Sequence, residues 1–304
     1  MRKPALAPRL AVPRRELLVG LTCAAIVVAV WTSFLLVSRA GAVGTLLPFD
    51  MAALRFGVAG LVMLPLLLRS GLSGLRLRQA LLLVVTAGLG FPLLAYAAFA
   101  LAPAAHGGVM MTGTLPLWTA VLAALLLGER LGGARLASLV LILLGVAALA
   151  APLRGASAAI LAGDLLFAGA SLSWAVYTIA ARAWAVPPLA ATAIVAVGAA
   201  VLYLPVYLLF LPKGLAATPW TELVGQGLFQ GIIAVIVSLL AFTRAVAALG
   251  PGPTTMIAAV VPGLGAVLAV PVLGERLEAA AVLGLVLVSL GMAGSVLALM
   301  RQTR

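Results

Sequence analysis

The sequence predicts an all-α polytopic membrane protein with ten transmembrane helices, arranged as two inverted five-helix repeats. Three observations support this fold class: an extreme apolar composition, ten long apolar runs and an internal repeat. Of the 304 residues, 65% are hydrophobic and 9% are charged, and the mean hydropathy is +1.28. Soluble domains carry about 25% charged residues. The composition therefore excludes a soluble enzyme, a disordered chain and a disulfide-framed secreted module.

Ten apolar runs, separated by glycine, proline and charged residues, each approach the roughly 20 residues that a spanning helix needs. Because hydrocarbon offers no water to the backbone, each run is expected to be helical, and none alternates as a barrel strand does. The first run follows a basic tail, residues 1–16, and is too long for a cleaved signal peptide. The runs cover residues 17–38, 47–68, 79–101, 107–127, 134–152, 163–184, 189–211, 223–245, 253–273 and 279–300.

Basic residues lie at the ends of these spans and indicate the orientation of the chain. With the N-terminus in the cytoplasm, fourteen basic residues fall in inside segments and four in outside segments, while Arg55 lies within a span. The positive-inside rule then predicts that both termini are cytoplasmic. The net charge of +12 is spread over the span ends rather than gathered in one patch, so no nucleic-acid partner is expected. The four outside residues are Arg39, Arg154, Lys213 and Arg276.

The two halves of the chain repeat each other. Residues 31–34 (Trp-Thr-Ser-Phe) recur as residues 174–177 (Trp-Ala-Val-Tyr), and residues 127–131 (Leu-Gly-Glu-Arg-Leu) recur unchanged as residues 273–277. Five spans per half is an odd number, so the second half begins on the opposite side of the membrane and the repeat is inverted. Inverted repeats are typical of secondary transporters, which hold substrate near the midplane between the repeats. The expected boundaries are 17–152 for the first repeat and 163–300 for the second.

Together these features resemble the EamA family of the drug/metabolite transporter superfamily. The resemblance rests on the five-plus-five arrangement, the Trp-x-x-aromatic motif in spans 1 and 6, and the Gly-Glu-Arg-Leu motif after spans 4 and 9, and it covers residues 17–297. Within the family, the layout is similar to bacterial amino-acid exporters of the YddG type, which implies aromatic and other neutral amino acids as substrates. The resemblance also implies a pathway formed by spans 3, 4, 8 and 9. This pathway adds as candidates Tyr96, Phe99, Trp118, Phe229 and Phe242.

The aromatic pairs of the repeated motif are the first candidates for substrate binding. Trp31 and Phe34 share a helix face, as do Trp174 and Tyr177, because residues three apart lie on one side of an α-helix. Rings at this depth can line a cavity and stack on an apolar ligand. The alternatives are helix–helix packing or an interfacial belt, and the central position of the rings in their spans disfavours the belt.

Glycine and proline interrupt spans 3, 4 and 9 and predict hinges, and rocking is expected at the breaks in spans 3–4 and 8–9. A proline inside a helix frees the carbonyl four residues back and permits a bend, and such interruptions in matching positions of two halves point to a binding site. The hinge candidates are Gly90, Pro92, Gly113, Pro116, Pro262 and Gly263. Beside them, Thr112 and Thr114 offer hydroxyls to an amino or carboxylate group, or alternatively bond to carbonyls of their own helix.

Few ionisable residues lie near the span interiors. His106, the only histidine, is expected between spans 3 and 4, either as a gating or pH-sensing group or as a solvated loop residue. Asp50 either takes part in coupling or caps span 2. Arg55 lies about 7.5 Å deeper and either faces the cavity, where it attracts a carboxylate, or snorkels outward. Asp164 is expected to cap span 6.

Several kinds of site are missing from the sequence. It contains no phosphate-binding loop, no metal-ligating cluster and no Ser-His-Asp set, so neither an enzyme nor a cofactor is expected. The motifs at Glu129 and Glu275 are interpreted as structural locks at loops. No acidic residue lies in the middle third of a span, which disfavours proton coupling.

With the resemblance, the sequence thus predicts a transporter of a bacterial-type inner (plasma) membrane that exports small neutral metabolites, amino acids in the first place, by alternating access through a central cavity. Its expected partners are the small-molecule substrate and the lipid bilayer, and two complete repeats in one chain allow a working monomer. The alternatives are a drug, cation or nucleoside exporter of the same superfamily and a non-transporting membrane scaffold. The lack of carboxylates within the spans counts against a cation.

Overall fold

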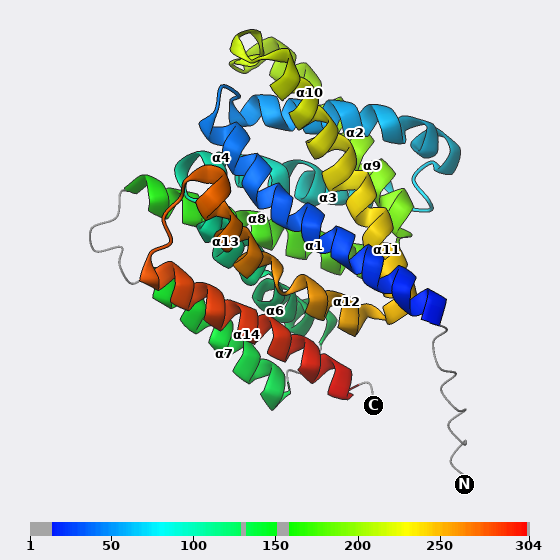
Figure 1. Cartoon of the computed structure of the whole chain (residues 1–304). Coiled ribbons are helices and arrows are strands. Elements are labelled where there is room, and N and C mark those ends of the chain that lie inside the picture. Colours follow the sequence, from blue (N-terminus) through cyan, green and yellow to red (C-terminus); the bar gives the residue numbers. More distant parts are fainter. Residues whose placement is uncertain (1–13, 129–131, 151–157, 303–304) are drawn as a thin grey trace.

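The computed structural model describes residues 14–128, 132–150 and 158–302, and over these ranges helices alternate with short turns and loops (Figure 1). Among the described residues, seven helical segments are long and apolar enough to cross a membrane, and three shorter apolar helices add to them. Each half of the chain contributes five spans. The predicted fold class, an all-helical polytopic membrane protein of ten spans in two inverted repeats, is confirmed.

The first half contains two continuous long helices, two broken spans and one shorter helix. Spans 1 and 2 are α1 (Arg14–Val43) and α2 (Pro48–Ser70). Span 3 is formed by α3 (Leu77–Leu83), η1 (Val84–Gly90) and α4 (Phe91–Leu101). Span 4 is formed by α5 (Ala104–Gly107), η2 (Gly108–Gly113) and α6 (Leu115–Leu127). The shorter span 5 is α7 (Gly133–Ala150).

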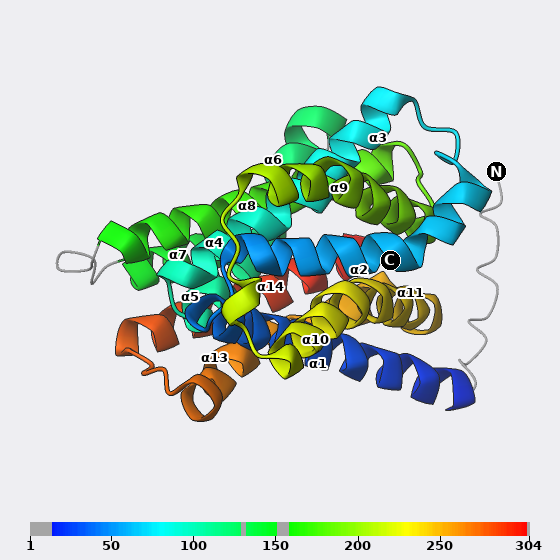
Figure 2. The same cartoon turned by 90° about the horizontal axis from the view of Figure 1, so that it is seen from above.

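The second half repeats this order, which Figure 2 shows from above. Spans 6 and 7 are the continuous helices α8 (Ala158–Ala183) and α9 (Pro188–Phe210). After a short 3-10 turn, η4 (Leu215–Ala217), the remaining spans are formed by α10 (Trp220–Leu228), η5 (Phe229–Val237) and α11 (Ser238–Leu249), then α12 (Pro251–Ala258) and α13 (Val261–Leu273), then α14 (Ala279–Gln302).

Both ends of the described chain lie at one end of the bundle, because ten spans bring the chain back to the side where it began (Figure 1). The start of α1 and the end of α14 mark this side, which we call the terminal end. The opposite side, where α1 ends and α14 begins, is called the distal end.

Spans 3, 4, 8 and 9 are not regular α-helices. The segments η1, η2 and η5 are π-helical, and two turn residues separate α12 from α13 in span 9. Pro92, Pro116 and Pro262 follow the breaks in spans 3, 4 and 9 and cannot donate a backbone hydrogen bond. The predicted breaks in these spans are therefore confirmed. The break expected in span 8 is present as η5, but no proline lies within this span. Such π-helical stretches occur frequently at functional sites.

Spans 5 and 10 pack at backbone distance, and Figure 1 shows α7 and α14 lying side by side. A Cβ atom on Gly145 would lie 2.7 Å from the carbonyl oxygen of Gly284, and a Cβ atom on Gly284 would lie 2.8 Å from that of Gly145. Gly291 is equally close to the carbonyl of Ser138, at 2.7 Å. Small residues at such crossings let helices in lipid approach closely.

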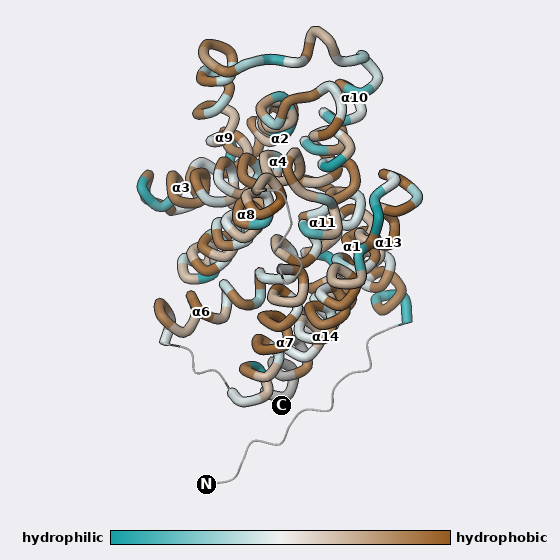
Figure 3. Tube along the Cα trace, turned by 90° about the vertical axis from the view of Figure 1, so that its left-hand side faces the viewer, coloured by the Kyte–Doolittle hydropathy of each residue, from teal (hydrophilic) through white to brown (hydrophobic). Residues whose placement is uncertain are grey.

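The outer surface of the bundle is apolar, as a lipid-facing surface must be. Leu68, Leu125 and Phe210 are at least 75% exposed, and many other large apolar side chains point outward with them. In Figure 3 hydrophobic residues predominate along the spans, and hydrophilic residues gather mainly near their ends and in the connecting segments. Because the outer surface and the interior are both apolar, side-chain packing inside the bundle positions the candidate site, and a polar surface facing an apolar core does not.

Candidate functional site

Aromatic rings from both halves form a continuous chain inside the bundle. Phe34 of α1 stacks on Phe91 of α4, with 6.1 Å between ring centroids, and Phe91 lies 4.9 Å from Trp174 of α8. Trp174 in turn lies 5.1 Å from Tyr177. One turn before Phe34, the ring of Trp31 stacks on Phe242 of α11, with 5.7 Å between ring centroids. The aromatic cluster, as we call it, consists of Trp31, Phe34, Phe91, Trp174, Tyr177 and Phe242.

The repeated motif thus supplies four of these rings, and the structure brings its two copies together. The linking residue is Phe91, which lies between the hinge candidates Gly90 and Pro92 and was not predicted to be a site residue. Its position at the helix break of span 3, where α4 begins directly after η1, could have marked Phe91 as a candidate. Within the aromatic cluster only Phe34 is buried. The other five members are partly buried.

The remaining aromatic candidates adjoin this cluster, and two of them contact the ring of Phe34. Tyr96 and Phe99 are fully buried behind Phe34, at 6.3 and 6.2 Å, so they are core residues in this conformation. Trp118 of α6 is partly exposed, and its buried indole nitrogen has no hydrogen-bond partner among the described residues. Phe229, at the start of η5, packs against the same core.

Span 8 adds two buried amides that the sequence analysis missed. The hydroxyl of Tyr96 donates to Oε1 of Gln230 at 2.9 Å, and Nε2 of Gln230 donates to Ser38 and Gln226 at 3.1 and 3.2 Å. Gln226 also donates to the carbonyl of Val37 at 3.1 Å. These bonds join α1, α4 and span 8 in a polar network whose groups satisfy one another.

Arg55 lies inside the bundle, so the inward-facing interpretation is correct and the snorkelling one is wrong. The side chain is only 9% exposed, and its guanidinium carbon lies 5.7 Å from the ring centroid of Phe34. The same ring of Phe34 also contacts Tyr96, with 6.3 Å between ring centroids. The terminal nitrogen Nη1 of Arg55 is buried without a hydrogen-bond partner within the described part of the chain.

Asp50 is fully buried at the distal end, where it closes the N-terminus of α2. Its carboxylate accepts hydrogen bonds from the amides of Leu47 and Gly214, at 2.8 and 2.9 Å, and from the hydroxyl of Tyr207 at 2.5 Å. The capping interpretation is therefore confirmed. Asp50 does not neutralise Arg55, because none of the described ion pairs joins them.

His106 and Asp164 form a pair at the distal end, with 2.9 Å between Nδ1 and Oδ1. The interpretation of His106 as a solvated loop residue is wrong, because its side chain is 16% exposed. The expected capping role of Asp164 is also wrong, because this residue lies within α8, which begins six residues earlier at Ala158. Sequence alone could not reveal the pair, since the two residues are 58 positions apart.

Glu275 holds three segments together at the distal end. It accepts a hydrogen bond from Nε of Arg39 at 3.0 Å and another from the amide of Ala104 at 3.0 Å. Arg39 also donates to the carbonyl of Phe99. The motif at Glu275 therefore acts as a structural lock, as interpreted, but it reaches across to the other half of the chain. The matching motif at Glu129 lies outside the described residues.

The hinge candidates lie at close helix contacts. A Cβ atom on Gly90 would lie 2.3 Å from Oγ of Ser173, and one on Gly113 would lie 2.3 Å from a methyl group of Val288. Pro262 contacts Gly108, whose added Cβ would lie 3.1 Å from the proline carbonyl. The other candidates adjoin these breaks, namely Pro92 at the start of α4, Pro116 at the start of α6 and Gly263 in α13.

The two threonines of span 4 differ. Thr114 donates to the carbonyl of Met110 at 2.6 Å, which is the local bond that the alternative interpretation expected. Thr112 is half-buried in η2, and its hydroxyl makes no hydrogen bond with another described residue. Of the two, Thr112 is the hydroxyl left for a ligand.

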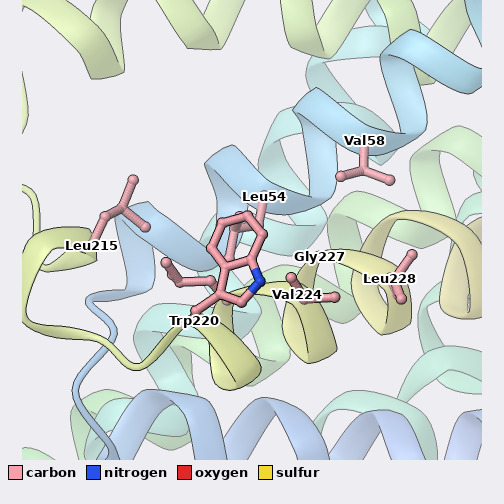
Figure 4. Close-up of a pocket in the computed structure, with 8 residues that line it drawn as sticks. Leu54, Val58, Leu215, Trp220, Val224, Gly227 and Leu228 are labelled. Carbon is pink, nitrogen blue, oxygen red and sulfur yellow. The ribbon is translucent and has the colours of Figure 1, made fainter.

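A separate groove of about 300 Å³ lies on the outside of the bundle between α2 and α10 (Figure 4). Trp220, which is 76% exposed, stands at its centre in this view. The surface of the groove is almost wholly apolar, so the groove suits a lipid acyl chain rather than a polar metabolite. The lining residues are Leu54, Val58, Leu215, Trp220, Leu223, Val224, Gly227 and Leu228.

The described residues hold no group of three or more histidine, cysteine or acidic side chains able to bind a metal ion. No curated protein matches the chain. A solved structure titled only "Crystal structure of protein" aligns over 95% of this chain and 99% of that chain, with a TM-score of 0.62 and 22% identity, which supports the fold alone. The EamA-like transporter family matches residues 18–151 and 161–297, one match in each half. On this evidence the chain belongs to the EamA-like transporter family.

Proposed function

We propose that this membrane transporter of the drug/metabolite transporter superfamily exports small neutral metabolites, with amino acids as the substrate class, by alternating access. The observation that carries the proposal is the aromatic cluster, which joins rings of both repeats beside the breaks in spans 3 and 8. Aromatic faces bind apolar and aromatic side chains, and convergent polar groups orient a ligand. Thr112 and carbonyls freed at the helix breaks are the polar groups proposed for this purpose.

The proposed motion is a rocking of the two repeats about the hinge residues of spans 3, 4 and 9. Transporters with inverted repeats commonly alternate in this way around a fixed central site. Gly113 and Pro262 lie at close contacts between spans, so small changes of backbone angle there move whole half-helices.

The proposed orientation places the terminal end in the cytoplasm of a bacterial-type inner membrane. The excess of basic residues in the segments at that end supports this orientation. One chain holds both repeats, so a monomer contains every part of the proposed pathway.

Two other functions compete with this proposal. A drug, cation or nucleoside exporter would use the same fold, but the buried cation Arg55 beside the cluster disfavours cationic substrates. A non-transporting scaffold would show neither flux nor stabilisation by small molecules.

The proposal is tested by uptake of labelled amino acids into proteoliposomes that contain the full chain. The panel consists of phenylalanine, methionine, threonine and leucine, with lysine and glutamate as charged controls, each measured with and without a pH gradient. We expect saturable flux of the neutral amino acids that persists when the gradient is collapsed. Flux of no panel member would overturn the amino-acid assignment and turn the search to drugs and nucleosides.

A further inference from the structure

Three charged residues are buried in the described part of the chain, namely Asp50, Arg55 and Asp164. Asp50 accepts three hydrogen bonds, and Asp164 pairs with His106. Arg55 makes no ion pair with a described residue, and its Nη1 atom is buried without a hydrogen-bond partner. A buried charge without an ion partner is costly, so Arg55 is a candidate for function rather than for stability.

We propose that Arg55 is the anchor for the carboxylate group of the transported substrate. Guanidinium groups bind carboxylates through two parallel N–H···O bonds, and these bonds are strong where water is excluded. A bound carboxylate supplies the two things that Arg55 lacks in this structure, a negative charge and an acceptor for Nη1.

The neighbours of Arg55 connect this anchor to the aromatic cluster. The guanidinium of Arg55 lies over the ring of Phe34, and the same ring stacks on Phe91. A carboxylate on Arg55 therefore brings the rest of the ligand to the aromatic cluster, where an apolar side chain finds ring faces. Phe34 also contacts the ring of Tyr96, whose hydroxyl donates a hydrogen bond to Gln230.

Arg55 is reached only when the protein moves, because the side chain is 9% exposed and Phe34 covers it. Displacement of Phe34 by the substrate would couple occupation of the anchor to a movement of α1. This inference rests on the proposed export of amino acids and narrows their recognition to the carboxylate, so amines and amides of the same shape are excluded.

The test compares four ligands that share one ring: phenylalanine, phenylalaninamide, phenethylamine and 3-phenylpropionate. Ligand-dependent thermal stabilisation of the purified full chain and flux into proteoliposomes are both measured. The variants are Arg55→Gln, which removes the charge, and Arg55→Lys, which keeps it without the planar fork. Arg69→Gln is the matched control, since Arg69 is an exposed arginine on the same helix.

In the wild-type protein we expect the two carboxylates to bind about tenfold or more tightly than the amide and the amine, as one charge-assisted pair provides. Arg55→Gln should abolish this preference, Arg55→Lys should retain part of it, and Arg69→Gln should leave it unchanged. Without ligand, Arg55→Gln should melt at the same temperature as the wild type or higher, because an unpaired buried charge is removed.

An equal response of the wild type to the acid and the amide would overturn the inference, as would an unchanged preference in Arg55→Gln. In either case amino-acid flux would leave the proposed function standing. Conversely, carboxylate binding that depends on Arg55 without any amino-acid flux would support the anchor and overturn the proposed amino-acid export. If Arg55→Gln fails to fold, the comparison of Arg55→Lys with Arg69→Gln decides the question.

Discussion

The indole N–H of Trp31 donates a hydrogen bond of 2.7 Å to the hydroxyl of Ser238, and this bond joins the first span of one repeat to the broken span 8 of the other. Ser238 is the first residue of α11, directly after η5. The same indole stacks on Phe242, one turn further along. A motif residue of the first repeat is therefore fixed to the point where span 8 returns from π-helical to α-helical geometry.

Ser238→Ala is expected to destabilise the protein by about 1–3 kcal/mol, because it leaves the indole N–H of Trp31 without its partner in a largely buried setting. Thermal unfolding in detergent measures the loss. Ser70→Ala is the control, since the hydroxyl of Ser70 is exposed and bonds within its own helix. Equal melting temperatures for the two variants would show that the bond to Trp31 contributes nothing measurable.

Trp174→Ala is expected to reduce amino-acid flux about tenfold, since it removes the ring that contacts both Phe91 and Tyr177. Initial rates in proteoliposomes, normalised to the amount of folded protein, give this number. Trp220→Ala provides the matched control, because Trp220 is 76% exposed in the outer groove. The assignment of the aromatic cluster to substrate binding fails if the two variants transport equally well.

The sequence predicted the features that depend on neighbours along the chain. Hydropathy located the spans, and the proline at each break located the irregular geometry of spans 3, 4 and 9, because a missing amide acts within one or two turns. The two copies of the Trp-x-x-aromatic motif also lie in one cluster, although Phe91, which connects them, was not predicted.

The features that the sequence missed depend on partners far along the chain. Gln230 looks like a polar residue in an apolar run, and only the fold brings it to Tyr96, 134 positions away. From their sequence neighbours, His106 was interpreted as a loop residue and Asp164 as a helix cap. Both interpretations are wrong, because span 4 packs on α8 and brings the two side chains together. Burial also decided the orientation of Arg55, which helix geometry had left open.

Gly113→Ala is expected to destabilise the protein by about 1–3 kcal/mol through overpacking, because its new Cβ would lie 2.3 Å from a methyl group of the buried Val288. Val288→Ala removes that methyl group and should restore part of the loss in the double variant. A double-mutant cycle of thermal stability gives the interaction energy of the pair. Strict additivity would contradict the close contact between η2 and α14.

Glu275→Gln is expected to lower stability by about 1–3 kcal/mol, because the amide carries no charge to pair with Arg39 and offers one acceptor oxygen where the carboxylate offers two to Arg39 and Ala104. Arg39→Lys should also be destabilising, since an ammonium group cannot serve Glu275 and the carbonyl of Phe99 with the same planar fork. Both variants are compared by thermal unfolding with Arg276→Gln, whose exposed side chain adjoins Glu275 and should be silent.

The cycle between Arg39 and Glu275 separates a lock from two independent residues. If the pair holds the halves together, the double variant Arg39→Gln, Glu275→Gln should lose less stability than the sum of the single variants, by more than about 0.5 kcal/mol. Additive losses would mean that each residue acts through other neighbours. Because Glu275 also binds the amide of Ala104, a coupled result would identify one unit that fixes the distal ends of spans 1, 4 and 9.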